Sequence, residues 1–95
     1  MARPRFPNRM KEIIFSKHAL LKVEILKAHG IIFNQEFVIN ALMHPNKIER
    51  GYKDRFIAQK KLDDDHVLRI VYEEYLEHIL VITLYPGRSQ RYEKN

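Results

Sequence analysis

The stretch Val67-Leu-Arg-Ile-Val-Tyr72 decides the fold of this chain together with a second stretch, Ile79-Leu-Val-Ile-Thr-Leu-Tyr85. Both are apolar and rich in β-branched residues, which favour strands, and the acidic link at residues 73–77 predicts a turn between them. The second strand is expected to end at Pro86-Gly87, since neither residue favours a strand interior. Arg69 is the only charged residue inside the first strand, and a guanidinium is unusual in an apolar strand unless it has a specific structural or functional role.

Upstream of this hairpin, capping residues predict two helices. Ser16 is a good N-cap for a helix over residues 17–29, whose apolar residues recur at helical spacing until Gly30. Asn34 is expected to cap a second helix over residues 35–43. Further strands are expected at residues 13–15, 48–52 and 55–62, with turns at 51–54 and 63–65.

This order of elements predicts an α+β fold. A short N-terminal strand is followed by two helices, which pack on one face of an antiparallel four-stranded meander. Residues 1–11 are expected to form a flexible basic arm, residues 12–92 a single domain and residues 93–95 a tail.

Alternation along each strand assigns side chains to the two faces of the sheet. The first strand of the hairpin places Leu68 and Ile70 on the buried face and Arg69 on the open one. The second strand is expected to bury Leu80, Ile82 and Leu84 and to turn Val81, Thr83 and Tyr85 the other way. Lys61 then shares the open face with Arg69, although a single β-bulge would reverse part of this assignment.

Composition narrows the classes of partner and chemistry. The chain of 95 residues has 17 basic and 12 acidic residues, and its net charge of +5 favours a polyanionic partner such as RNA. It has no cysteine, which excludes disulfides and thiolate chemistry. No apolar run approaches the roughly 20 residues of a membrane span, and no signal peptide is recognised, so a cytoplasmic protein without a membrane partner is expected.

Metal ions and cofactors are not expected. The histidines show no ligand spacing, and Asp63-Asp-Asp65 is interpreted as a turn rather than a cation site. The three glycines form no phosphate-binding loop.

Five short motifs carry a resemblance to a known family. They are Phe15-Ser-Lys-His-Ala19, Pro45 after the second helix, Ile57-Ala-Gln-Lys-Lys61, Leu68-Arg-Ile-Val-Tyr72 and Thr83-Leu-Tyr-Pro86. Together they resemble a small prokaryotic family of unknown function that is placed in the RelE/ParE-like toxin superfamily. The similarity covers roughly residues 12–92 and implies a compact fold with helices packed on an antiparallel sheet.

The resemblance also implies a function. Members of this superfamily cleave mRNA on the ribosome or inhibit gyrase, so the chain is expected to be a toxin of a toxin–antitoxin pair and a metal-independent endoribonuclease. The implied partners are an antitoxin protein and RNA or the ribosome. A homodimer is a further possibility. The matching catalytic positions are Lys61, Arg69, Tyr85, Arg88, Tyr92 and His18, and Arg55, Lys60 and Arg91 are candidates for RNA binding. No carboxylate is expected among these cations, so the base would be a lysine, histidine or tyrosine.

Each candidate also has a purely structural interpretation. Arg69 would pair with a cross-strand carboxylate, Lys61 would be a solvated edge charge, and His18 would bond to local backbone in the first helical turn. The tyrosines would cover the edge of the core. The alternative function is therefore a non-catalytic module that binds RNA or protein through the basic face or through the extra apolar side of the first helix.

Overall fold

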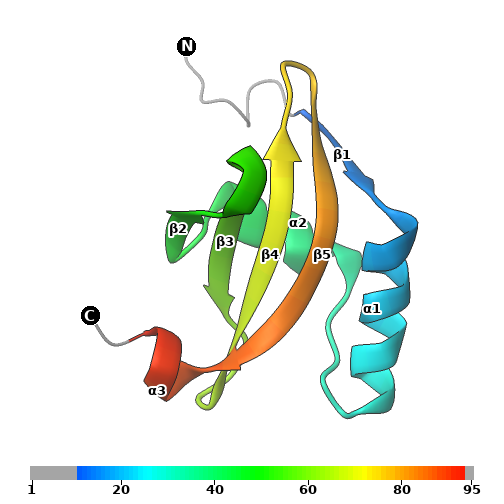
Figure 1. The fold of residues 1–95 in the computed structure, drawn as a ribbon. Helices are drawn as coiled ribbons and strands as arrows, with labels where there is room; N and C mark the ends of the chain where they lie inside the picture. Colours follow the sequence, from blue (N-terminus) through cyan, green and yellow to red (C-terminus); the bar gives the residue numbers. More distant parts are fainter. Residues whose placement is uncertain (1–10, 94–95) are drawn as a thin grey trace.

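The chain forms a single sheet with two helices packed against it and a short third helix near the C-terminus (Figure 1). The structure is a computed structural model that describes residues 11–93. Apart from Lys11 and Glu93, the expected basic arm and tail lie outside the described residues. The elements are β1 (Glu12–Phe15), α1 (Lys17–Ala28), α2 (Gln35–Met43), β2 (Lys47–Arg50), the 3-10 turn η1 (Tyr52–Asp54), β3 (Phe56–Lys61), β4 (His66–Glu74), β5 (His78–Arg88) and α3 (Ser89–Tyr92).

The sheet has five strands in the order β1-β5-β4-β3-β2 and is mixed. From β2 to β5, each strand pairs antiparallel with its neighbour in the chain. β1 joins the other edge in parallel with β5, so the whole sheet has five strands and is mixed, whereas the sequence predicted a four-stranded antiparallel meander after a short N-terminal strand. The chain between β1 and β5 contains both helices and strands β2 to β4, and this length makes the parallel pairing feasible, because parallel neighbours cannot be joined by a tight turn.

The capping residues define α1 and α2 as predicted. The Ser16 hydroxyl accepts the backbone N–H of Ala19 at 3.0 Å, and Asn34 accepts that of Phe37 at 2.8 Å. Gly30 follows α1 with a φ of 88°, in the left-handed region that favours glycine. α2 has the predicted bounds, whereas α1 ends one residue earlier than expected, at Ala28.

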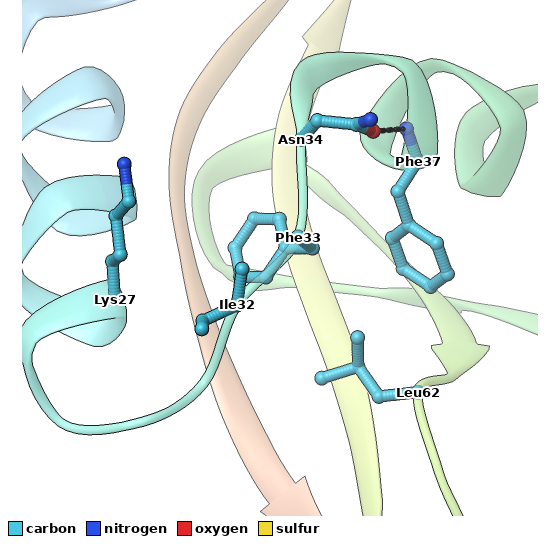
Figure 2. A pocket seen from close by; sticks show the side chains of 6 residues that line it. All are labelled: Lys27, Ile32, Phe33, Asn34, Phe37 and Leu62. Carbon is cyan, nitrogen blue, oxygen red and sulfur yellow. Dashed lines mark hydrogen bonds between the residues drawn. The ribbon is translucent and has the colours of Figure 1, made fainter.

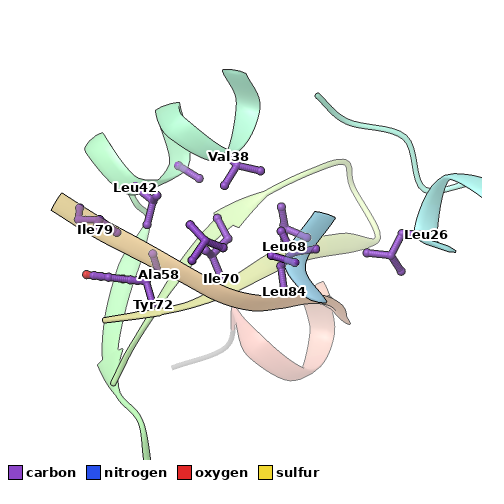
Figure 3. Packing of buried hydrophobic residues seen from close by; sticks show 12 residues of the cluster. Leu26, Val38, Leu42, Ala58, Leu68, Ile70, Tyr72, Ile79 and Leu84 are labelled. Atoms are coloured by element: carbon purple, nitrogen blue, oxygen red, sulfur yellow. The ribbon is translucent and has the colours of Figure 1, made fainter. Parts of the chain in front are cut away.

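Both helices pack apolar side chains on the same face of the sheet, and Figure 3 shows this packing. α1 contributes Ala19 and Leu26 to the core, and α2 contributes three residues, with Val38 completely buried. The sheet contributes Ala58, Leu68, Ile70, Tyr72, Ile79, Val81 and Leu84. Leu68, Ile70 and Leu84 therefore face inward as predicted.

A β-bulge changes the facing of β5. Val71 pairs with Thr83, but the next residue, Tyr72, pairs with Val81, so Ile82 has no partner of its own. The extra residue reverses the alternation on its N-terminal side. Val81 is completely buried in the core, while Leu80 is only partly buried. The expected inward facing of Leu80 and Ile82, and the outward facing of Val81, were wrong.

The C-terminal end of β5 also differs from expectation, because the strand continues through Pro86 and Gly87 to Arg88. β1 pairs only with the first part of β5, up to Val81, so the later part of β5 is an edge. Proline is found on edge strands because its missing N–H costs no ladder hydrogen bond on the unpaired side. α3 follows and lies across the sheet from α2, as Figure 3 shows. No helix among residues 11–93 is long and apolar enough to cross a membrane.

Candidate active site around Arg69

Arg69 lies in the middle of the sheet and is held by a polar row on the face opposite α1 and α2. The register places it between Gln59 of β3 and Tyr85 of β5. Its Nε donates to the Tyr85 hydroxyl at 3.0 Å, its Nη1 donates to Gln59 Oε1, and its Nη2 donates to Glu49 Oε1 at 2.6 Å. Only 4% of Arg69 is exposed. The guanidinium is therefore positioned by three strands at once.

Glu49 is the carboxylate that the sequence pattern did not reveal. Its Oε2 lies 3.2 Å from the Nζ of Lys47, so the carboxylate bridges two cations. The hydrogen bond from Arg69 is the main cause that lowers the pKa of Glu49, and the one from Lys47 adds to it. The carboxylate is consequently ionised at neutral pH. The expectation that no carboxylate accompanies the cations is wrong.

The hydrogen-bond partners of Arg69 stabilise its charged form. Burial alone would lower the pKa of Arg69, but hydrogen bonds to Glu49 and Tyr85 outweigh it and raise the pKa. The cross-strand ion pair foreseen as a structural alternative is thus present, with its carboxylate two strands away on β2 rather than on the adjacent strand. Arg69 is therefore charged at neutral pH.

Tyr92 on α3 covers the guanidinium. The Cζ of Arg69 lies 4.3 Å from the centre of the Tyr92 ring, which is the geometry of a cation–π contact. The backbone carbonyl of Tyr92 accepts a hydrogen bond from Gln59 Nε2 at 3.2 Å. The ring also lies against Gly87, where an added Cβ would come within 2.4 Å of it. The sheet face expected to be open is therefore closed by α3 at this point.

The two lysines at the end of β3 point in different directions. Lys61 shares the face of Arg69 by register, but its Nζ lies 3.8 Å from Asp64 and the side chain is half exposed. Lys60 lies on the opposite face and its Nζ donates to the carbonyl of His44, just after α2, at 2.7 Å. Neither lysine contacts Arg69 in the structure.

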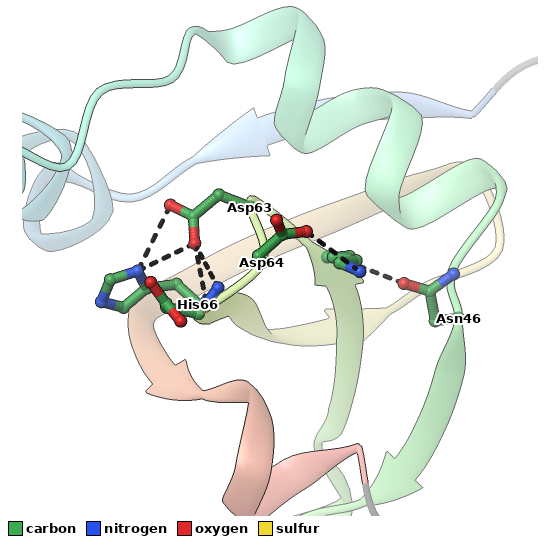
Figure 4. Close-up of polar contacts among 6 residues, drawn as sticks. Asn46, Asp63, Asp64 and His66 are labelled. Atoms are coloured by element: carbon green, nitrogen blue, oxygen red, sulfur yellow. Dashed lines mark hydrogen bonds and ion pairs between the residues drawn. The ribbon is translucent and has the colours of Figure 1, made fainter.

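The acidic segment after β3 is a turn, as predicted, and Figure 4 shows how it is held. The Asp63 carboxylate accepts the backbone N–H groups of Asp65 and His66, each at 2.8 Å. The N–H of Asp65 is the main cause that lowers the pKa of Asp63, and His66 adds to it. Among residues 11–93, no three His, Asp or Glu side chains gather closely enough to hold a metal ion.

The remaining predicted residues make no hydrogen bond to the guanidinium of Arg69. His18 is exposed in the first turn of α1, the helix that packs on the other face of the sheet. Arg55 pairs with Glu73 at 2.9 Å at the far end of β4, where hydrogen bonds from Tyr75 and then Arg55 lower the pKa of Glu73. Arg88 is exposed just before α3, and Arg91 lies 5.8 Å from the Tyr92 ring.

An apolar pocket of about 530 Å³ lies on the helix side, separate from this cluster (Figure 2). It is lined by Lys27, Ile32, Phe33, Asn34, Phe37 and Leu62. None of the predicted site residues reaches it.

The structure thus gathers Arg69, Tyr85 and Tyr92 from the predicted set and adds Glu49, Lys47 and Gln59. The cations of such a network are able to bind a phosphate, and the carboxylate and the phenol are groups that accept and donate protons. Comparisons of the chain with protein-family models, with curated proteins and with solved structures found no match.

Proposed function

We propose that this chain is a RelE/ParE-like toxin that cleaves mRNA without a metal ion, with Glu49 and Arg69 at its catalytic centre. The observation that carries the proposal is the Glu49 carboxylate, 2.6 Å from Arg69 and on the same sheet face as Tyr85. It supplies the base that the sequence motifs lacked. The resemblance of those motifs to the superfamily supports the choice of RNA as substrate.

The reaction is an internal transfer of the phosphate. The ribose 2′-oxygen attacks the adjacent phosphorus, a 2′-O–P bond forms, and the bond to the 5′-oxygen of the next nucleotide breaks. A base takes the proton of the 2′-hydroxyl, and an acid gives a proton to the departing 5′-oxygen. The products are a 2′,3′-cyclic phosphate and a 5′-hydroxyl, and cations stabilise the charge that develops on phosphorus-bound oxygens.

Three side chains take these roles. Glu49 is ionised at neutral pH and accepts the 2′-hydroxyl proton. Arg69 binds the phosphate, because its hydrogen bonds to Glu49, Gln59 and Tyr85 leave further N–H groups on a donor-rich guanidinium. The hydroxyl of Tyr85 accepts the Arg69 Nε–H, so its own proton is directed elsewhere and is available to the leaving oxygen.

The test is cleavage of a defined mRNA, both on purified ribosomes and as naked RNA in EDTA. Wild type is compared with Glu49→Gln and Arg69→Lys. The matched control is Glu24→Gln, at an exposed position of α1. We expect a 2′,3′-cyclic phosphate end with wild type and a loss of about 10²-fold or more in rate for Glu49→Gln. Absence of cleavage by the wild type on both substrates, or full activity of Glu49→Gln, would refute the proposal.

A non-catalytic module is the second candidate, and the burial of Arg69 favours it. An arginine that is 4% exposed and bonded to three side chains is also what a structural ion pair looks like. This candidate predicts RNA or protein binding without cleavage. Its RNA affinity would fall steeply with salt and would not be lost in Glu49→Gln, which removes a negative charge from the basic face. An antitoxin protein is the partner implied by the first candidate.

A further inference from the structure

The catalytic cluster is closed over Arg69 but open over Glu49. The side chain of Glu49 is 41% exposed and that of Lys47 is 40% exposed, whereas the side chain of Arg69 is 5% exposed. The difference arises from α3, since the ring of Tyr92 lies on the guanidinium. A phosphate approaching from solvent therefore meets the carboxylate first and the arginine only if Tyr92 moves.

Few contacts hold α3 in this position. It is a helix of four residues without a buried residue or a side-chain N-cap bond. Apart from the ring of Tyr92, it is held by the bond from Gln59 to the Tyr92 carbonyl and by the Ser89 N–H, which donates to the carbonyl of Asp65 at 2.9 Å. Ser89 Oγ is buried and has no partner among the described residues. A segment with so few buried contacts opens locally at much lower cost than the sheet beneath it.

Gly87 provides the space into which Tyr92 closes. A Cβ at this position would lie 2.4 Å from two atoms of the ring, closer than carbon atoms approach. Gly30 is the only described glycine with a positive φ, so the backbone at Gly87 does not itself require glycine. The absence of a side chain at Gly87 therefore matters for the ring of Tyr92.

We propose that α3 is a lid that regulates the Arg69 site, with Tyr92 as the group that closes it. In the closed form, the ring of Tyr92 covers the guanidinium and keeps a phosphate away. In the open form, Arg69 stays bonded to Glu49 and Tyr85 and presents its remaining N–H groups to the phosphate. This inference rests on the proposed function, because it names the regulation of the same site.

The experiment measures exposure of the guanidinium directly, without RNA. The folded protein is labelled with phenylglyoxal, which modifies arginine, and the rate at Arg69 is followed by peptide mass spectrometry. Tyr92→Ala removes the ring, and Gly87→Ala adds a methyl group where the ring lies. The control is Tyr52→Ala, at a tyrosine that is 80% exposed. Arg55, which is paired with Glu73, serves as the internal standard in every sample.

We expect labelling of Arg69, relative to Arg55, to be about tenfold faster in both lid variants, which corresponds to about 1.4 kcal/mol. Tyr52→Ala should label at the wild-type ratio. Tyr92→Phe keeps the ring and should also label slowly; if it labelled as fast as Tyr92→Ala, the ring would not be the closing group. If both Tyr92→Ala and Gly87→Ala labelled Arg69, relative to Arg55, at the wild-type rate, the lid proposal would be refuted.

The same variants separate this inference from the proposed function. Faster labelling of Arg69 together with faster RNA cleavage supports both. Faster labelling with no RNA cleavage in any form keeps the lid and refutes the ribonuclease. Unchanged labelling with normal cleavage refutes the lid and keeps the ribonuclease. Unfolding is recognised because it raises labelling of Arg55 as well, and a variant that unfolds is replaced by the other lid variant.

Discussion

The bulge in β5 leads to a sharp prediction about stability: truncating Val81 should cost more than truncating its larger neighbour Leu80. Val81 is completely buried against the helices, whereas Leu80 is partly exposed on the other face. Strict alternation from the sequence predicts the opposite order. The pair therefore tests the register of β5 rather than hydrophobicity in general.

The magnitude follows from burial. Val81→Ala removes two buried carbons, about 1.6 kcal/mol of transfer free energy at about 0.8 kcal/mol per carbon. The cavity left behind adds roughly 1 kcal/mol at about 24 cal/mol per Å³ for a void of about 40 Å³. We therefore expect a loss of about 2.5 kcal/mol for Val81→Ala. Leu80→Ala should lose about 1 kcal/mol, because part of its side chain is already in water.

Urea unfolding followed by far-UV circular dichroism measures both values. With a slope of about 1 kcal/mol per molar urea, the midpoint of Val81→Ala should lie about 2.5 M below that of the wild type, and that of Leu80→Ala about 1 M below. A larger loss for Leu80→Ala than for Val81→Ala would refute the bulge and restore simple alternation.

Three further predictions concern single polar groups. Ser16→Ala should lose about 1–2 kcal/mol in urea unfolding, because the hydroxyl caps α1 and also donates to the carbonyl of Ile82 at 2.8 Å; Ser16→Thr should keep most of the stability. The pKa of Asp63 is lowered in the folded protein, so the carboxylate contributes to folding stability above its unfolded pKa and this contribution is lost as the pH falls below about 4. The difference in unfolding free energy between wild type and Asp63→Asn should therefore shrink below that pH. A difference that stays constant with pH would contradict this prediction. Burial, with the nearby Glu74, raises the pKa of Tyr72 to about 12. The neutral phenol therefore contributes to folding stability below about pH 10, and this contribution is lost as the pH rises toward 12. Wild type should therefore lose more stability than Tyr72→Phe between pH 9 and 11, and equal losses would show that the phenol titrates normally.

Local signals predicted much of the fold. The bounds of α2 and the caps at Ser16 and Asn34 follow from side chains that bond to backbone within the same few residues. The inward facing of Leu68 and Ile70 follows from alternation, because the bulge lies beyond both residues, after Val71. The facing of Val81 could not be predicted, since a bulge arises from how two strands meet.

The candidate site was predictable only in part, for a similar reason. Arg69 stood out because a charge inside an apolar strand is unusual, and alternation placed it beside Tyr85. Glu49 lies on β2, two strands away, in a segment that was expected to be a strand at residues 48–52 but that no sequence signal connected to Arg69. The side chain of an arginine is long enough to cross an intervening strand, and this reach is invisible in the order of residues.

The sequence by itself determined the type and the sequential order of the two long helices and of the strands, because caps, turns and alternation act over a few residues. Only the tertiary structure decided that β1 joins β5 in parallel, that β5 continues past Pro86, and that α3 folds back over the sheet. It also decided that Arg69 meets Glu49. These features depend on contacts between segments far apart in the chain, whose free energy is gained only when the whole sheet is assembled.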